Sequence, residues 1–339
     1  MKLIQVILSC GLLASSAALA QDANPITIRV AHGLSDDSHL GRSADIAAEQ
    51  IKRRSNGRLI VKILGKAVVG SDTKAMEEAL AGNVEIFIGS SNFVTPIYKP
   101  LAIWETPFLF ANYAEADAML DGKVGRYLLD GVSEGGLVGL AFWENGFRSM
   151  TNNVRPITRV EDFEGIRLRT MPSQVSINTF KRLHVDAKPL PFNELRAALE
   201  NNVFDGQENP LPTIVSARIH EVQKFLTITN HTYTPYGVMA AKKWWTTLSA
   251  ADQKIIRDAF WDTRIYQRQE SRKASEAAMT VIKNSGVKVS ELALGERARI
   301  ANRLERVIAQ IAGTVGLPLW IELNNDLNEN RAQKRAAQH

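Results

Sequence analysis

The sequence predicts an α/β protein built as two lobes. Strand-like and helix-like segments alternate from residue 26 onward, and a second series of the same kind begins near Arg148. From Trp244 the chain is mostly helical. With 339 residues it is long enough to form two hydrophobic cores. Because long helices follow two strand–helix series, we expect the chain to cross the boundary between the lobes more than once.

Hydrophobic periodicity defines the first series. Residues 26–31 alternate apolar and polar side chains as a strand does, and Ala44, Ala47 and Ile51 recur at helical spacing. Strand–helix–strand units of this kind imply a largely parallel sheet with helices on both faces. The expected elements are strands over 26–31, 59–64, 84–88 and 137–143, and helices from Ala44 to a stop at 56–57 (NG), over 73–80 and over 115–129.

The second series and the helices after it are predicted in the same way. Ser249 is a candidate N-cap of a long amphipathic helix, because its side-chain oxygen can accept a hydrogen bond from the first turn. The segment 324–339 is polar, and we expect it to fray. The other expected elements are strands over 165–170 and 225–229 and helices from Val175, over 192–201 and over 295–311.

The N-terminus has the pattern of a secretory signal peptide. Lys2 precedes an apolar run that ends at Leu19, and the small residues up to Ala20 match a cleavage site. The run is short for a membrane anchor, so a retained anchor is only the alternative. Cys10, the only cysteine, lies in this leader, so a chain starting at Gln21 has no thiol for catalysis, metal binding or disulfides. We therefore expect a periplasmic protein, cleaved after Ala20, whose mature chain does not insert into a membrane.

The charge pattern gives no sign of nucleic-acid binding. The chain has 41 Lys and Arg against 36 Asp and Glu, a net charge of +5 that becomes +4 once Lys2 leaves with the leader. The basic residues are dispersed, and they do not alternate with aromatic residues along a stripe. A mild positive charge attracts anions, although it is more often only a property of a soluble surface.

The segment 131–135 (GVSEG) matches the G-x-S-x-G nucleophile elbow of serine hydrolases. That elbow requires a strand before the serine and a helix after it. Here the predicted helix over 115–129 comes first and the strand over 137–143 follows, so we interpret the segment as a glycine-rich turn. A secreted hydrolase that uses Ser133 or a pair of carboxylates remains the competing functional class.

No metal, cofactor or phosphate site is predicted. None of the six histidines belongs to an H-E-x-x-H motif, and no pair has ligand spacing beside carboxylates. The segment 70–74 (GSDTK) lacks the first half of a phosphate-binding loop. His32 differs from the others because it ends the first strand, where ligands meet open α/β sheets.

Arg167 and Arg169 lie two residues apart on the predicted strand over 165–170, so they should share one face. Arg169 is at the carboxyl end of that strand, where the ligand crevice of such sheets lies. A guanidinium needs a partner where water is scarce, and a carboxylate matches its planar fork with two parallel hydrogen bonds. The pattern indicates either a site for an organic anion or a structural salt bridge.

Two further polar features accompany this arginine. Arg148 follows the segment 143–147 (WENGF), where we expect the chain to pass between lobes, and a solvated loop arginine is the alternative. The segment 205–210 (DGQENP) predicts a polar turn. Within it Asn209, which is biased to an extended backbone by Pro210, donates to a ligand or caps a helix that starts near the proline.

Together these motifs resemble a known family. In 142–148 (FWENGFR), 163–169 (FEGIRLR), 189–194 (PLPFNE), 205–210 and 229–231 (TNH), the chain is similar to the solute-binding proteins of TRAP (tripartite ATP-independent periplasmic) transporters. It is most similar to their dicarboxylate-binding branch, over essentially the whole mature chain. The resemblance implies a two-lobed periplasmic binding protein, type II-like, with crossing strands and a long hinge helix.

The lobes of such a protein close around an organic acid. We expect residues 21–145 and 235–274 to form lobe I, residues 146–234 and 275–323 to form lobe II, and 324–339 to be a polar tail after them.

The resemblance also implies binding without chemistry. The carboxylate-clamping arginine of the family falls on Arg169, a second ligand arginine on Arg148, the ligand asparagine on Asn209 and the aromatic wall on Phe192. Further contacts are expected from His32, Asp72, Ser90, Tyr233 and Tyr236.

The chain departs from the family pattern in lobe I. It has 64–67 (LGKA) and 69–72 (VGSD) where members often have an aromatic-Pro segment and then Leu-Gly-Asp, and its loop over 33–38 is unusual. These loops face the distal end of the ligand, so they leave the substrate open.

The expected function is the delivery of an organic acid to the small and large membrane subunits of an importer, without enzymatic activity. A C4-dicarboxylate is favoured because of the branch resemblance and the paired arginines. The alternative is a sugar acid or a hydroxy or keto acid. A binding protein that serves a sensor would have the same fold and a different partner.

Overall fold

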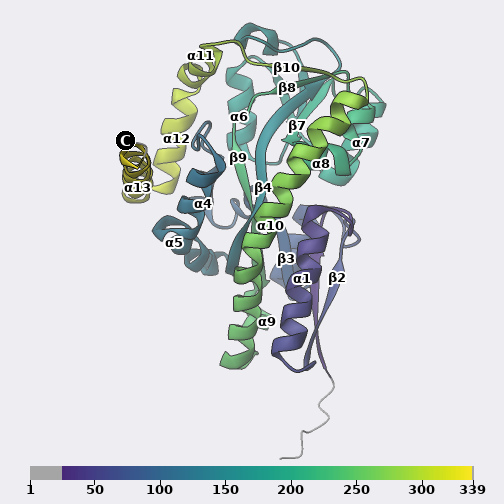
Figure 1. The fold of residues 1–339 in the computed structure, drawn as a ribbon, viewed down its shortest axis with the longest axis vertical. Coiled ribbons are helices and arrows are strands. Elements are labelled where there is room, and N and C mark those ends of the chain that lie inside the picture. Colours follow the sequence, from purple (N-terminus) through teal and green to yellow (C-terminus); the bar gives the residue numbers. More distant parts are fainter. Residues whose placement is uncertain (1–24, 338–339) are drawn as a thin grey trace, which may run out of the picture.

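The computed structural model describes residues 25–337, so the expected signal peptide with Cys10 and Ala20, and also His339, lie outside the described residues. The described strands form one mixed sheet in the order β2-β1-β3-β9-β4-β7-β5-β6, and β8 and β10 join it through β4 (Figure 1). The strands are β1 (Ile26–His32), β2 (Leu59–Leu64), β3 (Ile86–Ser90), β4 (Leu137–Asn152), β5 (Arg167–Thr170), β6 (Asp186–Pro189), β7 (Gly206–Pro210), β8 (Phe225–Ile228), β9 (Tyr233–Ala241) and β10 (Lys288–Glu291).

Parallel groups of strands lie on either side of two connecting strands. In lobe I, β1 pairs in parallel with β2 and β3. In lobe II, β5 pairs in parallel with β6 and β7, and β8 with β10. The connecting strands β4 and β9 run antiparallel to each other and to their other neighbours. The expected largely parallel sheet is therefore right within each group and wrong at the centre.

Strand β4 passes from one lobe to the other. Residues from Leu137 to Phe147 pair with β9, whereas Arg148 to Asn152 pair with β7. The register shifts just before Gly146, which has φ 117°, a conformation that favours glycine. The sequence predicted only 137–143 of this strand, because polar side chains interrupt the apolar pattern beyond that point. The exact lobe boundaries stay a prediction.

The helices follow the predicted order with two differences. Each of the helices expected over 115–129 and 295–311 is divided into two, the first at Gly122 and the second at Leu304. The segment Val132–Gly135 is a 3₁₀ turn between a helix and β4, as predicted for the GVSEG motif. The longer helices before the C-terminal region are α1 (His39–Arg54), α2 (Asp72–Ala81), α4 (Tyr113–Asp121), α5 (Lys123–Gly131), α6 (Gln174–Arg182), α7 (Phe192–Glu200) and α8 (Leu211–Ser216).

Helix α10 (Ala250–Asn284) runs along both lobes and contacts α1 in one lobe and α8 in the other (Figure 1). Ser249 caps it as predicted, since its hydroxyl accepts from the Asp252 backbone N–H. Buried polar contacts attach the helix to β4. The Gln267 amide exchanges hydrogen bonds of 2.6 and 2.7 Å with the backbone of Glu144. The helix is thus fixed to the strand that connects the lobes.

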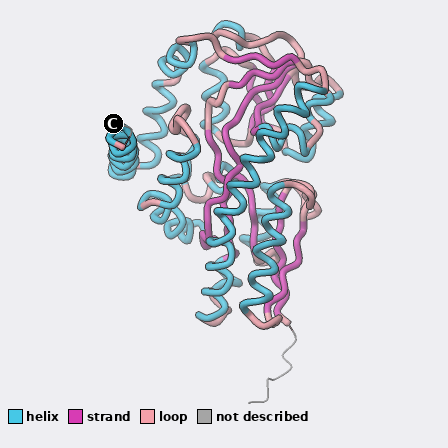
Figure 2. The backbone as a smooth tube through the Cα atoms, viewed as in Figure 1, coloured by secondary structure: helices cyan, strands magenta, loops and turns pink. Residues whose placement is uncertain are grey.

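The expectation that 324–339 frays is wrong for the part that the structure describes. After α11 (Glu296–Arg303) and α12 (Glu305–Val315), helix α13 (Leu317–Ala336) continues almost to the end and packs beside α4 and α5 (Figure 2). Leu327 is buried, and Arg331 pairs with Glu115 at 2.8 Å. The composition concealed this packing because Leu327 is the only large apolar residue of the segment 324–339.

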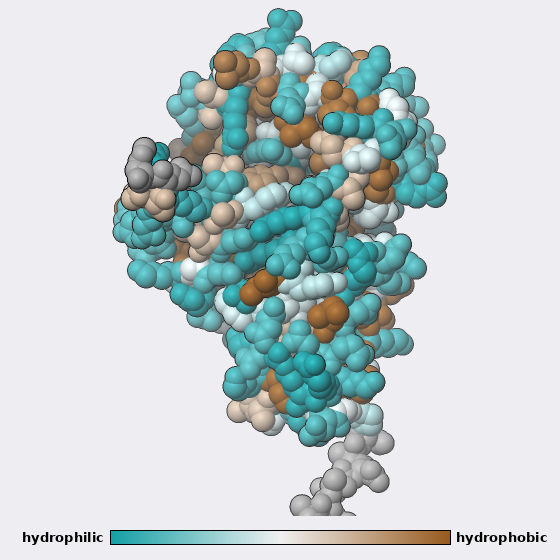
Figure 3. Space-filling view, viewed as in Figure 1, coloured by the Kyte–Doolittle hydropathy of each residue, from teal (hydrophilic) through white to brown (hydrophobic). Residues whose placement is uncertain are grey.

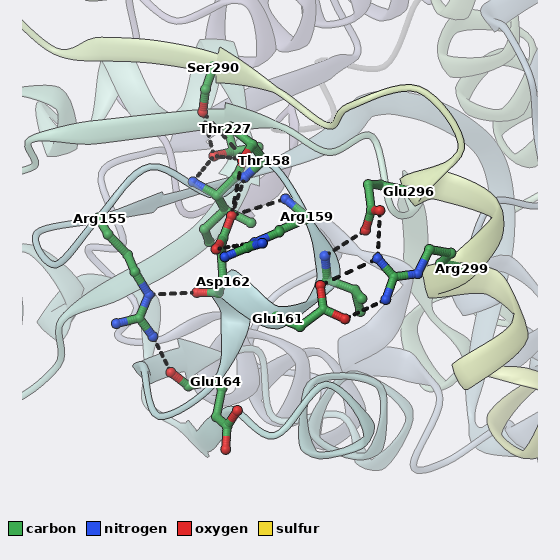
Figure 4. Close-up of polar contacts among 12 residues, drawn as sticks. Arg155, Thr158, Arg159, Glu161, Asp162, Glu164, Thr227, Ser290, Glu296 and Arg299 are labelled. Carbon is green, nitrogen blue, oxygen red and sulfur yellow. Dashed lines mark hydrogen bonds and ion pairs between the residues drawn. The ribbon is translucent and has the colours of Figure 1, made fainter.

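A polar network attaches α11 to lobe II (Figure 4). Arg299 pairs with Glu161 and, at 2.7 Å, with Glu296, whose carboxylate also accepts from the Val160 backbone. The network holds the C-terminal helices against the loop before β5.

Hydrophilic residues predominate on the face drawn in Figure 3, and hydrophobic ones form small separate patches there. Among residues 25–337, no single helix is long and apolar enough to cross a bilayer. The helices α12 and α13 meet that criterion only as a pair, with a bend of 116° between them.

Candidate functional site

A cavity lies between the lobes, where the carboxyl ends of β1 and β3 face those of β5 and β7. It encloses about 420 Å³ of space, part of it open to solvent. The parallel strands of each lobe bring their carboxyl ends to one edge, and this places polar side chains at the cavity wall. Six of the predicted binding residues line it, namely Asp72, Ser90, Arg169, Phe192, Asn209 and Tyr236.

Arg169 is buried in the cavity wall without an acidic partner. Only 1% of its surface is exposed, and its Nε donates to the Leu190 carbonyl at 2.8 Å. Its buried Nη2 has no hydrogen-bond partner, and it forms no ion pair among the described residues. Burial lowers the pKa of Arg169 to about 10, with Glu208 opposing this and Arg148 adding to it. A buried cation with free donors is a receptor for an anion.

Arg148, the second predicted ligand arginine, lies outside this cavity. Its Nε and Nη2 donate to the two carboxylate oxygens of Glu208, and its Nη2 also donates to the Asn209 side chain at 3.0 Å. Burial alone would raise the pKa of Glu208, but Arg148 and His231 lower it to about 2. The expected free charge of Arg148 is therefore neutralised by a carboxylate of the protein itself.

The predicted polar turn over 205–210 is wrong, because 206–210 form β7, a buried strand inside the sheet. Its polar side chains pair with one another and with β4. Asn209 accepts from Arg148 and donates to the Gln207 amide oxygen at 2.5 Å, so this wall residue keeps one amide proton that a ligand can accept. Asn209 does not cap the helix that follows Pro210.

Asp72 is the acidic side chain of the cavity. It is the first residue of α2, and its carboxylate packs against Gly33 so closely that a Cβ there would lie 2.9 Å from Oδ1. Burial raises the pKa of Asp72 to about 6, and the Arg169 charge limits the rise. Nearby, the Ser90 hydroxyl donates to Asn92 at 2.8 Å.

Two other predicted residues do not reach this cavity. Tyr233 donates to Glu144 at 3.3 Å and packs edge-on against Phe110 and Phe147. His32 is buried, and burial lowers its pKa to about 4, so the ring is neutral at physiological pH.

A second, smaller cavity lies beside the first and shares Met171 with it. Glu105 is buried in its wall, where it accepts from Ser173 and, at 3.1 Å, from Thr95. It forms no ion pair among the described residues, and burial raises its pKa to about 7. The Arg148–Glu208 pair lines the same cavity.

Sequence reasoning missed several wall residues. Asn145 belongs to the WENGF segment, and Met171 follows Arg169 closely, so their position was a usable signal. Gly33 and Leu34 belong to the loop over 33–38, which the resemblance placed at the distal end of the ligand. The remaining ones are apolar or isolated and carry no signal of their own, namely Leu40, Ile88, Phe93 and Thr213. Within residues 25–337, no group of three or more metal-ligating side chains occurs.

The chain matches the family model described as "Bacterial extracellular solute-binding protein, family 7" over residues 30–314. It belongs to this family. The family is that of TRAP-type periplasmic solute-binding proteins, as predicted, and it is not a family of enzymes.

Relatives and solved structures agree on the fold. A C4-dicarboxylate-binding periplasmic protein of Rhodobacter capsulatus is 29% identical, and the match covers 90% of this chain and 93% of the relative. The crystal structure of a sugar acid binding protein of Advenella mimigardefordensis in complex with galactonate is 37% identical, with a TM-score of 0.88 over 91% of this chain and 99% of that one. A TRAP solute-binding protein of Sulfurospirillum deleyianum with bound succinate is 29% identical, with a TM-score of 0.83 over 88% and 98%. Acids of different chemistry are thus bound on this fold.

Proposed function

We propose that this protein captures an organic acid anion in the periplasm and delivers it to the membrane subunits of a TRAP transporter. The N-terminal leader directs it there and is cleaved after Ala20. The ligand carboxylate accepts two parallel hydrogen bonds from Arg169. Asn209 donates to the same anion, and Phe192 covers it against water. No bond is made or broken.

The observation that carries this proposal is the state of Arg169. A buried guanidinium without an acidic partner costs folding free energy, and an anion that enters the cavity removes that cost. The pairing of Arg148 with Glu208 supports the same assignment, since it leaves Arg169 as the cation that a ligand meets in this wall.

The ligand also holds the lobes together. Asp72 and Ser90 come from lobe I, whereas Arg169, Phe192 and Asn209 come from lobe II. A molecule that touches both sets binds the closed arrangement better than an open one, so it shifts the protein toward the closed form. The membrane subunits then recognise the closed form.

Two acid classes are candidates. The sequence favours a C4-dicarboxylate, which the Rhodobacter capsulatus relative is named for, and the galactonate complex of the Advenella mimigardefordensis protein favours a sugar acid. Delivery to a sensor in place of a permease is the alternative for the partner.

A thermal-shift screen over organic acids tests the proposal, with wild type compared to Arg169→Ala. A ligand at 100 times its Kd stabilises the folded protein by about 2.7 kcal/mol, which corresponds to a Tm shift of about 4 °C for a chain of this size. We expect Arg169→Ala to lose this shift and to keep its own melting transition.

The matched control is Arg167→Ala, two residues earlier on the same strand. Arg167 is 47% exposed and pairs with Asp205 at 2.6 Å, so its removal should leave the ligand-induced shift unchanged. Equal loss in both variants would contradict a specific role for Arg169, and turnover of a bound acid in mass spectrometry would contradict the binding function.

A further inference from the structure

The charged side chains in the cavity wall determine which class of acid the cavity accepts. This inference rests on the proposed function. Among the described wall residues only Arg169 and Asp72 carry a charge at pH 7.5, and they come from opposite lobes. They form no ion pair with each other. The wall therefore offers one cation to one carboxylate, and the remaining charge that a ligand meets is negative.

Asp72 has free acceptor capacity. Its side chain forms no ion pair among residues 25–337, and Gly33 packs against its carboxylate from the loop after β1. An ionised carboxylate accepts hydrogen bonds and donates none. A hydroxyl group is the neutral partner that satisfies it, through a charge-assisted O–H···O⁻ bond.

The rest of the wall fits a neutral polar body. Ser90, Asn145, Thr213 and Tyr236 carry hydroxyl or amide groups without charge, and Phe192 adds an apolar face. Among the residues that the structure describes, this wall holds no second cation for a second carboxylate, and the neighbouring Arg148 is paired with Glu208. A dicarboxylate would have to place an anionic group in the field of Asp72.

We infer that Asp72 is a specificity-determining residue, which accepts a hydrogen bond from a ligand hydroxyl and selects hydroxylated monocarboxylates over dicarboxylates and over keto acids without hydroxyl groups. Arg169 holds the carboxylate at one end of the ligand. Asp72 recognises the hydroxylated end across the cleft, so the same contact contributes to closure.

A dependence on pH follows from the groups that face Asp72. Arg169 on β5 and Tyr236 on β9 are the ionisable wall residues packed toward it, and Tyr236 stays protonated because burial raises its pKa. The pKa of Asp72, raised to about 6 by burial, makes the group ionised at pH 7.5 and mostly protonated at pH 5. Discrimination against dicarboxylates should therefore weaken at pH 5.

Isothermal titration calorimetry at pH 7.5 tests the inference with threonate, gluconate and galactonate against succinate and fumarate. Wild type should bind at least one of the hydroxy acids about tenfold or more tightly than either dicarboxylate. Asp72→Asn should weaken binding of that acid by about 10- to 100-fold and should strengthen binding of succinate. The melting transition of the variant verifies that it folds.

Asp45→Asn is the control, since it removes an exposed carboxylate of α1 in the same lobe that does not line the cavity. It should leave every affinity unchanged. Tighter wild-type binding of a dicarboxylate than of all three hydroxy acids overturns the inference and leaves the proposed function in place, as does an Asp72→Asn variant with wild-type affinities. Absence of binding by any organic acid in the thermal-shift screen contradicts the proposed function itself.

Discussion

Two buried arginines of lobe II differ in one respect that separates structure from function. Arg148 and Arg169 are 2% and 1% exposed. Arg148 is paired with the Glu208 carboxylate and also donates to the Glu208 carbonyl and the Asn209 side chain, which leaves only its buried Nη1 without a hydrogen bond. Arg169 has one hydrogen bond, to a backbone carbonyl, and a buried Nη2 without a partner. The first charge is balanced within the protein, and the second is left for a ligand.

Burial alone therefore does not identify a binding arginine. What identifies it is the absence of an internal counter-charge at a cavity wall. Removing one member of a satisfied buried pair leaves the other member as an uncompensated buried charge, which destabilises the fold. Removing a buried charge that has no partner instead removes the free-energy cost of its desolvation. The two arginines should therefore respond in opposite ways to changes in their surroundings.

The largest effect is expected from Glu208→Ala. This change leaves Arg148 buried without its carboxylate, so we expect the free energy of unfolding to fall by about 3–5 kcal/mol. Urea denaturation of the ligand-free protein measures it. Asp205→Ala removes the carboxylate of the half-exposed Arg167 pair and is the control, with a smaller loss. An equal loss in the two variants would mean that the buried Arg148–Glu208 pair matters no more for stability than the half-exposed Arg167–Asp205 pair.

An intermediate effect is expected from Glu105→Gln, measured as a function of pH. Glu105 resembles Arg169 in being a buried ionisable side chain with no ion pair among the described residues. Burial raises the pKa of Glu105 to about 7. The folded state holds this proton more tightly than the unfolded state does. Glu105 therefore destabilises the protein progressively as pH rises from about 4.5 to about 7, by up to about 3 kcal/mol.

In Glu105→Gln this contribution disappears, so stability should fall less between pH 4.5 and 8 than in wild type. Denaturation curves across that range give the slope for both proteins. Identical slopes would mean that the pKa of Glu105 is the same in the folded and the unfolded state. Its burial without an ion pair among the described residues argues against that result.

The smallest effect is expected from Arg169→Met in the ligand-free protein. The change removes an unpaired buried charge and loses one hydrogen bond to Leu190, so the free energy of unfolding should change by less than about 1 kcal/mol or increase. Urea denaturation without ligand measures it. A loss as large as that of Glu208→Ala would show that Arg169, like Arg148, has a structural partner.

Much of this architecture was predictable because it is encoded locally. The strand over 59–64 and the helix capped by Ser249 follow from periodicity and capping within a few residues. Arg169 was predictable as a binding residue, since a charged side chain at the carboxyl end of a strand stands out from its apolar neighbours. The resemblance to a family then added the partner positions.

The rest depends on contacts between residues far apart in the chain. Arg148 and Glu208 are separated by 60 residues and meet only because β4 and β7 pair antiparallel. Before that pairing is known, the polar sequence of β7 suggests a turn, and Arg148 appears as an arginine without a counter-charge. The prediction for the end of α13 was wrong for the same reason, since Arg331 contacts Glu115, which lies 216 residues earlier in the sequence.

The most direct test of the central claim is a crystal structure of the protein with its acid bound. We predict that the ligand carboxylate accepts two parallel hydrogen bonds from the Arg169 guanidinium, while Arg148 stays on Glu208. A structure in which Arg169 is paired with Asp72 or another carboxylate of the chain, and the acid is held by other groups, would contradict the account.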